Sequence, residues 1–287
     1  MKLNADSFNL DVTLCCGQVF RWDKKGDWWY GIVGNTAFKV RQKNAELESV
    51  NVDETTLEHY FRLDEDYAKI VSSINKDAHI NKAIEAFRGL RLVRQDPWEC
   101  LISYICATYK GIAAINQMLL RLSKKFGERV TFEDHDFYTF PAPEKLARTT
   151  EDSLATCGLG YRAKYVLETS RKICEGSFEL ESLKQTPYQQ AKKTLFTLPG
   201  VGLKVADCVL LFSLEKPEAF PVDIWILRTL LRHYSEHFPK AFIEKLSSQE
   251  SLSNSAYEKL NAFGRNHFGE YAGYAQEYLY HYERMQH

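Results

Sequence analysis

Within residues 1–87, the order of apolar and polar positions predicts β-strands. Residues 28–33, Trp-Trp-Tyr-Gly-Ile-Val, form a short apolar run, and the segment after it alternates, with Phe38 and Val40 on one side and basic residues on the other. Gly34-Asn35, between the two segments, is a hairpin turn signal. The pattern therefore predicts an antiparallel β-hairpin, and we expect residues 1–87 to form a β-rich (TBP-like) domain.

From about Asn81 onward the spacing is helical. Asp96-Pro97 supplies a capping side chain followed by proline at the first helical position. Residues 112–126 repeat apolar side chains along one face, as an amphipathic helix does. We therefore expect an α+β protein, in which an N-terminal twisted antiparallel β-sheet domain precedes an all-α region over residues 88–287.

The overall charge does not favour a nucleic-acid partner. The 287 residues contain 37 Lys and Arg against 38 Asp and Glu, for a net charge of −1. A DNA-binding function would therefore depend on backbone donors and a local basic face. Charge alone is more typical of an enzyme that acts on small molecules.

Cysteine usage and the N-terminal residues indicate the compartment. The seven cysteines are scattered without a C-x-x-C pair, which is typical of reduced thiols. No apolar run approaches the ~18–20 residues of a membrane span, and MKLNADSFNL lacks the apolar core of a signal peptide. We expect no membrane partner and a cytoplasmic location, at the nucleoid in a prokaryote.

The most informative motif of the helical region is a glycine-rich hairpin at residues 199–202, Pro-Gly-Val-Gly. Pro199 ends one helix, and a second helix starts near Leu203. Gly200 and Gly202 leave the backbone N–H groups open to a phosphate, at the positive end of the second helix. This predicts a sequence-independent anchor for the DNA backbone. We expect Lys192 and Lys193, on the preceding helix, to be solvated.

Reactive side chains follow this hairpin. Lys204 lies in the first turn of the second helix, where the helix dipole and burial favour a neutral, nucleophilic amine. Cys208, four residues later, shares its helix face. Asp223 is placed to cap a third helix and stays oriented toward a developing cation. The pattern therefore makes Lys204 a candidate nucleophile and Asp223 an oriented acid near it.

The segment LPGVGLKVADC, followed by PVD, resembles the helix-hairpin-helix, Gly/Pro-Asp superfamily of DNA glycosylases, and in particular the 8-oxoguanine DNA glycosylases. The resemblance implies that Lys204 attacks the anomeric carbon of the damaged nucleotide while Asp223 assists. It also implies that Gly200, Val201 and Gly202 grip the DNA. Further blocks match in the family order, at residues 16–22, 91–106, 157–165, 198–208, 221–223 and 273–280.

The same resemblance assigns the base pocket. Gly17, in the Gly-Gln-x-Phe-Arg-Trp stretch, is implied to accept the ring N–H that 8-oxoguanine has and guanine lacks. Gln276 is placed at the Watson–Crick edge of the base. Tyr280, where the family usually has phenylalanine, is implied to stack on the base opposite Cys208. As alternatives, Gly17 serves only a turn, and Tyr280 belongs to an aromatic core stripe.

The residues that face the opposite strand depart from the family. The family has asparagines and then an arginine that read the orphaned cytosine, whereas this chain has Tyr109 and then Ala114. Tyr109 is expected to fill the gap left by the extruded base. Tyr161 matches the family wedge, and Arg162 matches a residue that touches the cytosine. We therefore expect a relaxed demand for cytosine opposite the lesion.

Together these residues predict a bifunctional base-excision-repair enzyme that removes 8-oxoguanine through a lysine Schiff base and then nicks the strand by β-elimination. The alternatives are a glycosylase for another modified purine and a non-catalytic helix-hairpin-helix DNA-binding protein. The expected partner is double-stranded DNA containing 8-oxoguanine, bound by a monomer. No cofactor or metal ligand set is expected. Because no cysteine follows Cys208, the iron–sulfur cluster of some related glycosylases is excluded, while the family allows a monovalent cation at the hairpin.

Overall fold

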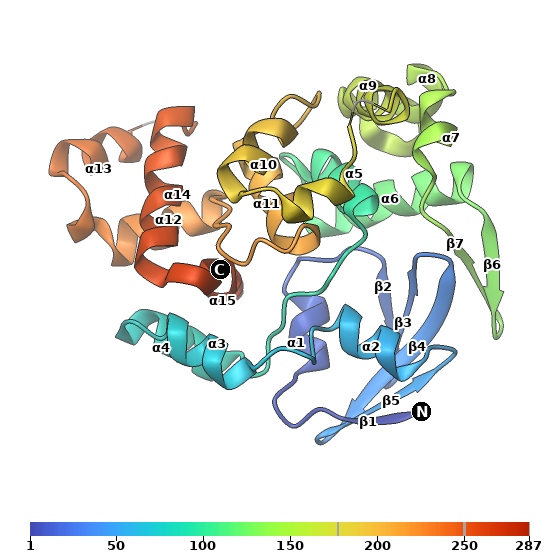
Figure 1. Cartoon of the computed structure of the whole chain (residues 1–287), viewed down its shortest axis with the longest axis horizontal. Coiled ribbons are helices and arrows are strands. Elements are labelled where there is room, and N and C mark those ends of the chain that lie inside the picture. Colours follow the sequence, from blue (N-terminus) through green and yellow to red (C-terminus); the bar gives the residue numbers. More distant parts are fainter. Residues whose placement is uncertain (177, 249–250, 287) are drawn as a thin grey trace.

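The computed structural model describes residues 1–176, 178–248 and 251–286. Its N-terminal part is a five-stranded antiparallel sheet in the order β1-β5-β4-β3-β2 (Figure 1). The strands are β1 Lys2–Asn4, β2 Trp22–Lys25, β3 Trp28–Val33, β4 Thr36–Lys43 and β5 Glu46–Val50. The hairpin expected between β3 and β4 is confirmed, with Gly31 opposite Phe38 and Trp29 opposite Val40.

One face of this sheet is buried because its apolar residues alternate. Phe38 and Val40 lie in a cluster with Trp22 of β2, Trp29 of β3 and Leu57 of helix α2 (Glu54–Tyr60). Gly31 is required at its position, since a Cβ there would lie 2.6 Å from the Trp22 ring. The sheet is therefore a packed, self-contained unit beside the helical region.

The rest of the described chain is mostly helical, which together with the sheet confirms the α+β class. The remaining α-helices are α1 Leu10–Cys15, α3 Tyr67–Ile74, α4 Ala78–Ala86, α5 Pro97–Ala107, α6 Ile112–Phe126, α7 Pro143–Ala147, α8 Glu151–Leu154, α9 Arg162–Cys174, α10 Tyr188–Leu195, α11 Leu203–Ser213, α12 Ile224–His233, α13 Lys240–Ser247, α14 Asn254–Phe268 and α15 Ala272–Met285. The region expected to be all-α is not entirely helical, because it also contains a two-stranded hairpin, β6 Arg129–Phe132 and β7 His135–Tyr138, which lies against the sheet. In the described part of the chain, no helix is long and apolar enough to span a membrane.

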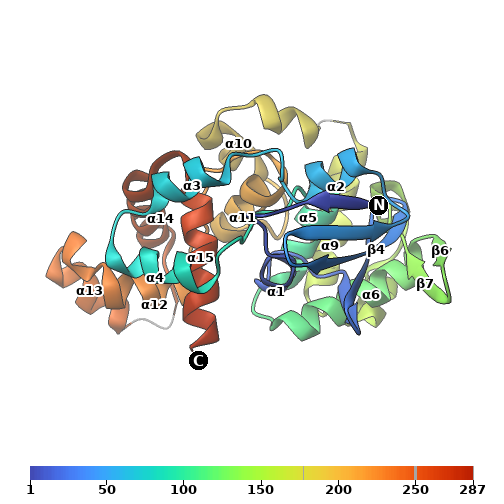
Figure 2. The same ribbon diagram turned by 90° about the horizontal axis from the view of Figure 1, so that it is seen from below.

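Helices α3 and α4 connect the two halves. They follow the sheet in sequence, yet their apolar residues Ile70, Ile74 and Ile80 belong to the larger helical core. Figures 1 and 2 show both helices beside α15, and they contact it directly. The domain boundary after residue 87 stays a prediction.

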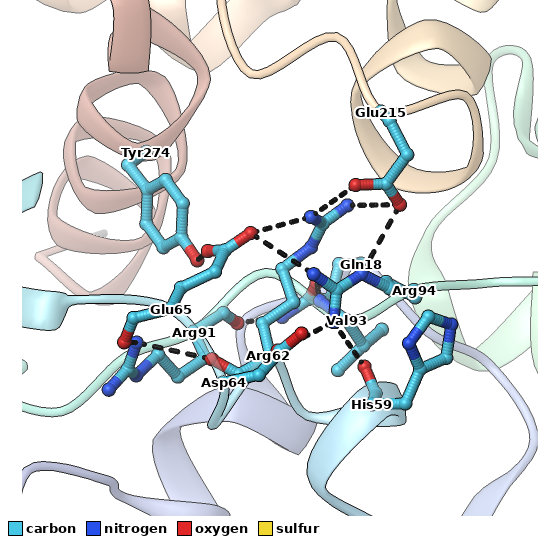
Figure 3. Close-up of polar contacts among 10 residues, drawn as sticks. All are labelled: Gln18, His59, Arg62, Asp64, Glu65, Arg91, Val93, Arg94, Glu215 and Tyr274. Carbon is cyan, nitrogen blue, oxygen red and sulfur yellow. Dashed lines mark hydrogen bonds and ion pairs between the residues drawn. The ribbon is translucent and has the colours of Figure 1, made fainter. Parts of the chain in front are cut away.

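A buried ion-pair network joins the sheet domain to the helices (Figure 3). Arg62 is 4% exposed, and its guanidinium donates to Glu65 and to Glu215, in the segment after α11, at 2.7 Å each. Glu65 also accepts from the Tyr274 hydroxyl of α15 at 2.6 Å. Arg94 pairs with the same two carboxylates. The network fixes the sheet domain against α11 and α15, which both line the site described next.

Candidate active site

The hairpin between α10 and α11 has the geometry that the sequence predicts. Val201 N donates to Leu198 O at 3.1 Å, which closes the turn. Gly200 has φ +77, and a Cβ there would lie 2.7 Å from the Tyr165 side chain. Gly202 caps α11 without a side-chain hydrogen bond, so the first N–H groups of the helix stay open. The turn therefore offers backbone donors at a positive helix end.

Lys204 and Asp223 face one cavity from two helix starts. Lys204 lies half-buried in the first turn of α11, and Asp223 caps α12, where its side chain accepts from Ile226 N at 2.9 Å. Burial raises the pKa of Asp223, and the positive charge of Lys204 is the largest opposing influence. Within the described residues the two groups make no direct ion pair. The lysine is thus electrostatically coupled to its acid, with its amine open to the cavity.

The cavity has a volume of about 860 Å³ and is lined by segments far apart in the sequence, a size typical of ligand sites. Its walls include residues that the sequence singled out: Gly17, Tyr109, Gly200, Gly202, Lys204, Cys208, Asp223, Gln276 and Tyr280. The structure therefore brings Lys204 and Asp223 into one cavity with the residues that the sequence analysis assigned to a base pocket.

The turn at Gly17 is held rigidly next to Tyr280. Gly17 has φ +106, and a Cβ there would meet the Tyr280 hydroxyl at 3.2 Å. The neighbouring Gln18 is fully buried: its Nε2 donates to the Arg91 carbonyl at 2.7 Å and its Oε1 accepts from Val93 N at 2.8 Å (Figure 3). A side chain at position 17 would therefore crowd the pocket as well as strain the backbone.

The remaining pocket walls combine an apolar sulfur with an unsatisfied amide. Cys208 is 3% exposed, and burial raises the pKa of its thiol, so the group is neutral. Gln276 is 4% exposed, and its Oε1 has no hydrogen-bond partner. A buried amide oxygen without a partner is costly, so this side chain is suited to a ligand that donates hydrogen bonds.

The residues expected to enter the DNA differ sharply in exposure. Tyr109 is 89% exposed and has φ +54, while Tyr161 is 56% exposed. Arg162, by contrast, is 3% exposed and donates to the carbonyls of Thr108 and Leu159. It thus ties the loop that carries Tyr109 to the turn that carries Tyr161. The contact of Arg162 with an opposite base stays a prediction. That contact would require the hydrogen bonds from Arg162 to these carbonyls to break.

The expectation that Lys192 is solvated was wrong. Its ammonium is 3.0 Å from Asp207 and 3.1 Å from Glu258, and the residue is 3% exposed. Asp207 also accepts from the hydroxyl of Tyr257, which in turn accepts from Val222 N next to Asp223. Position 192 follows the buried Tyr188 by one helical turn, so the two residues share a helix face. This spacing was the sequence signal that Lys192 is buried. Lys193 is exposed, as expected.

The described residues contain no group of three or more His, Cys, Asp or Glu side chains placed to hold a metal ion. All seven cysteines are free thiols, as the sequence predicted.

Two family descriptions match this chain. The "8-oxoguanine DNA glycosylase, N-terminal domain" matches residues 1–101, and the "HhH-GPD superfamily base excision DNA repair protein" matches residues 102–263. The chain is 31% identical to "N-glycosylase/DNA lyase OGG1" of Arabidopsis thaliana, over 98% of this chain and 78% of the relative.

Solved structures agree over the whole chain. The 8-oxoguanine glycosylase/lyase of Clostridium acetobutylicum, in complex with double-stranded DNA containing cytosine opposite 8-oxoG, superposes with a TM-score of 0.87 at 31% identity, covering 98% of this chain and 93% of that one. MBOgg1 in complex with a low-affinity DNA ligand gives a TM-score of 0.89 at 30% identity, covering 99% and 95%.

Proposed function

We propose, given that the chain belongs to the HhH-GPD superfamily of base excision DNA repair proteins, that this DNA glycosylase and lyase removes 8-oxoguanine from duplex DNA with Lys204 as its nucleophile. The observation that carries the proposal is the shared cavity. It holds a half-buried lysine at a helix N-terminus, a half-buried acid coupled to it, and room for a base beside an unsatisfied amide oxygen.

In the proposed reaction, the unprotonated form of the Lys204 amine forms a bond to C1′ of the everted nucleotide. The bond from C1′ to the purine breaks, and its electron pair leaves with the base, which takes up a proton. Asp223 stabilises the positive charge that develops on the sugar. The nitrogen then loses a proton and its lone pair forms the C1′=N bond of a Schiff base, while the C1′–O4′ bond breaks and O4′ takes up a proton. Loss of a C2′ proton expels the 3′ phosphate and nicks the strand.

Base recognition is assigned to the opposite wall of the cavity. The Gly17 carbonyl accepts the ring N–H of 8-oxoguanine, and Gln276 accepts from the Watson–Crick edge. Cys208 and Tyr280 hold the ring between a neutral sulfur and an aromatic face. Everting the nucleotide costs a few kcal/mol, which this stacking partly offsets.

The DNA is proposed to be gripped on the backbone by the hairpin at residues 199–202, while Tyr109 and Tyr161 fill and buckle the gap. Their exposure supports this role. Tyr109 carries a single hydroxyl in place of the family's cytosine-reading side chains, and Arg162 is held inward. We therefore propose a weak preference for cytosine opposite the lesion. Excision rates on duplexes with each of the four opposing bases test it, and a thousandfold preference for cytosine would refute it.

Borohydride trapping on an 8-oxoguanine duplex tests the nucleophile. The wild-type protein is expected to give a covalent protein–DNA adduct and Lys204→Gln none, while Lys193→Gln, at an exposed lysine of α10, traps normally. Excision by the wild type without any trappable adduct would refute Lys204 as the nucleophile. Activity only on other modified purines would show that 8-oxoguanine is not the substrate. DNA binding without nicking would indicate a non-catalytic DNA-binding protein.

Further properties also stay proposals: a monomeric state, no required cofactor, a monovalent cation held by backbone carbonyls at the hairpin, and a cytoplasmic location at the nucleoid. Dialysis against a chelator leaves trapping unchanged under this proposal. Exchange of potassium for lithium weakens DNA binding if the hairpin uses the cation.

A further inference from the structure

Glu277 is a buried acid in the cavity wall that the reaction above does not use. It follows Gln276 on α15 and is 2% exposed, yet it lines the same cavity. Its Oε1 has no hydrogen-bond partner. Two adjacent residues of the cavity wall thus both carry a buried side-chain oxygen without a hydrogen-bond partner. In a well-packed core such atoms are rare.

Glu277 lines the cavity together with Gly17 and Asp223. Its carboxyl interacts with the thiol of Cys16, the residue before Gly17, and with the charge of Asp223. The other charged or titratable groups that interact with it are Arg284, one turn further along α15 from Tyr280, and the side chains of Tyr104, Cys208 and Tyr280. If Gly17 meets N7 of an 8-oxopurine and Asp223 faces the sugar on N9, a group that interacts with both sides can face C8.

The protonation state of Glu277 follows from burial. Burial raises the pKa of this carboxyl to about 7, while the nearby Cys16 thiol and the charge of Arg284 lower it and the charge of Asp223 raises it. Burial also raises the pKa of the Cys16 thiol well above 9, so Cys16 remains neutral. At and below neutral pH, Glu277 therefore carries a proton in a substantial fraction of molecules and can donate a hydrogen bond.

We propose that Glu277, in its protonated form, donates a hydrogen bond to the oxygen at C8 of the everted 8-oxopurine and is a second lesion-reading residue beside Gly17. The proposal rests on the function proposed above. Guanine has a hydrogen at C8 and offers no acceptor there, so the contact favours the lesion. The ionised carboxylate would face the same oxygen with lone pairs only, so the contact requires the proton.

A merely structural role predicts different behaviour. A buried carboxyl with an unpaired oxygen destabilises the empty protein, so Glu277→Leu is expected to unfold at a denaturant concentration no lower than the wild type. Loss of stability in Glu277→Leu would show that the fold needs the carboxyl, and would overturn the assignment. Glu277→Gln keeps a donor of the same shape at every pH.

The test compares single-turnover excision of 8-oxoguanine by the wild type, Glu277→Gln, Glu277→Leu and the exposed control Glu270→Gln. Wild-type and control rates are expected to fall as the pH rises through about 7, the pKa of Glu277. Glu277→Gln keeps its rate across that range. Glu277→Leu loses about tenfold or more at the acidic end, the value of one hydrogen bond to the lesion.

Borohydride trapping on abasic-site DNA, which has no base to read, separates this proposal from the function it rests on. Under the proposal, all four proteins trap abasic DNA equally. Failure of the wild type to form an adduct with abasic DNA refutes Lys204 as the nucleophile. The role of Glu277 is then tested by the excision rates alone. Excision by Glu277→Leu at the wild-type rate, or an equal loss on 8-oxoguanine and abasic DNA, overturns the reading role of Glu277.

Discussion

Replacing Lys192 with methionine removes the only cation within ion-pair distance of Asp207 among the described residues. The substitution keeps the length of the side chain and its apolar stem on α10. Asp207 is 0% exposed, and burial raises the pKa of its carboxyl, with the charge of Lys192 the largest opposing influence. Without Lys192, the carboxylate has neutral donors alone and must remain as a buried, unpaired charge or take up a proton.

The magnitude follows from what is left around Asp207. Breaking a buried pair by removing one partner costs about 3–5 kcal/mol. Asp207 keeps hydrogen bonds from Tyr188, Tyr257 and Asn261, at 2.5, 2.6 and 3.1 Å. We therefore expect the lower end, about 3 kcal/mol. For a chain of 287 residues, that corresponds to a fall in the melting temperature of roughly 5 °C.

Urea unfolding of the wild type, Lys192→Met and the exposed control Lys193→Met measures this cost. The control is expected to lie within about 0.5 kcal/mol of the wild type. The double variant Lys192→Met/Asp207→Asn removes both charges and should recover most of the lost stability. If Lys192→Met unfolds at the same urea concentration as Lys193→Met, the buried pair contributes nothing and the reasoning fails.

Three further predictions concern the pocket and the domain contact. Gly17→Ala, with φ +106 and a Cβ 3.2 Å from the Tyr280 hydroxyl, should lose excision of 8-oxoguanine in a single-turnover assay while trapping of abasic DNA persists. Glu215→Gln removes one charged partner of the buried Arg62 and should lower the free energy of unfolding by about 1 kcal/mol. Burial raises the pKa of Glu277 to about 7 against an ordinary 4.5, because the ionised carboxylate is penalised in the fold. The penalty is absent below about pH 4.5 and grows as the pH rises through 7, so wild-type stability should fall over that range, and urea titrations of Glu277→Gln should lack that component.

The local elements could be predicted because their causes lie within a few residues. The turn at Gly34-Asn35 joins its two strands as expected, and Asp96 and Asp223 cap their helices through side-chain bonds to N–H groups three residues later. Gly200 is needed where the chain takes a positive φ. Each of these depends on backbone geometry and hydrogen bonding over one turn.

Local sequence patterns predict only part of the candidate site. Lys204 and Cys208 share a helix face by spacing alone. That Gly17 and Gln276 meet them in one cavity depends on how the sheet domain packs against α11 and α15, and without the family resemblance the residue order would not have shown it. The family resemblance identified the site residues because its matching blocks include residues that lie far apart along the chain.

What the sequence by itself determined is therefore the set of elements, their caps and turns, and the identity of the reactive side chains. What only the tertiary structure decided is which polar groups are desolvated: Lys192 is buried against Asp207, Arg162 is turned inward to backbone carbonyls, and Glu277 lies unpaired in the cavity wall. The physical reason is that a charge is stabilised or penalised by partners and by lost water, and both come from segments remote along the chain.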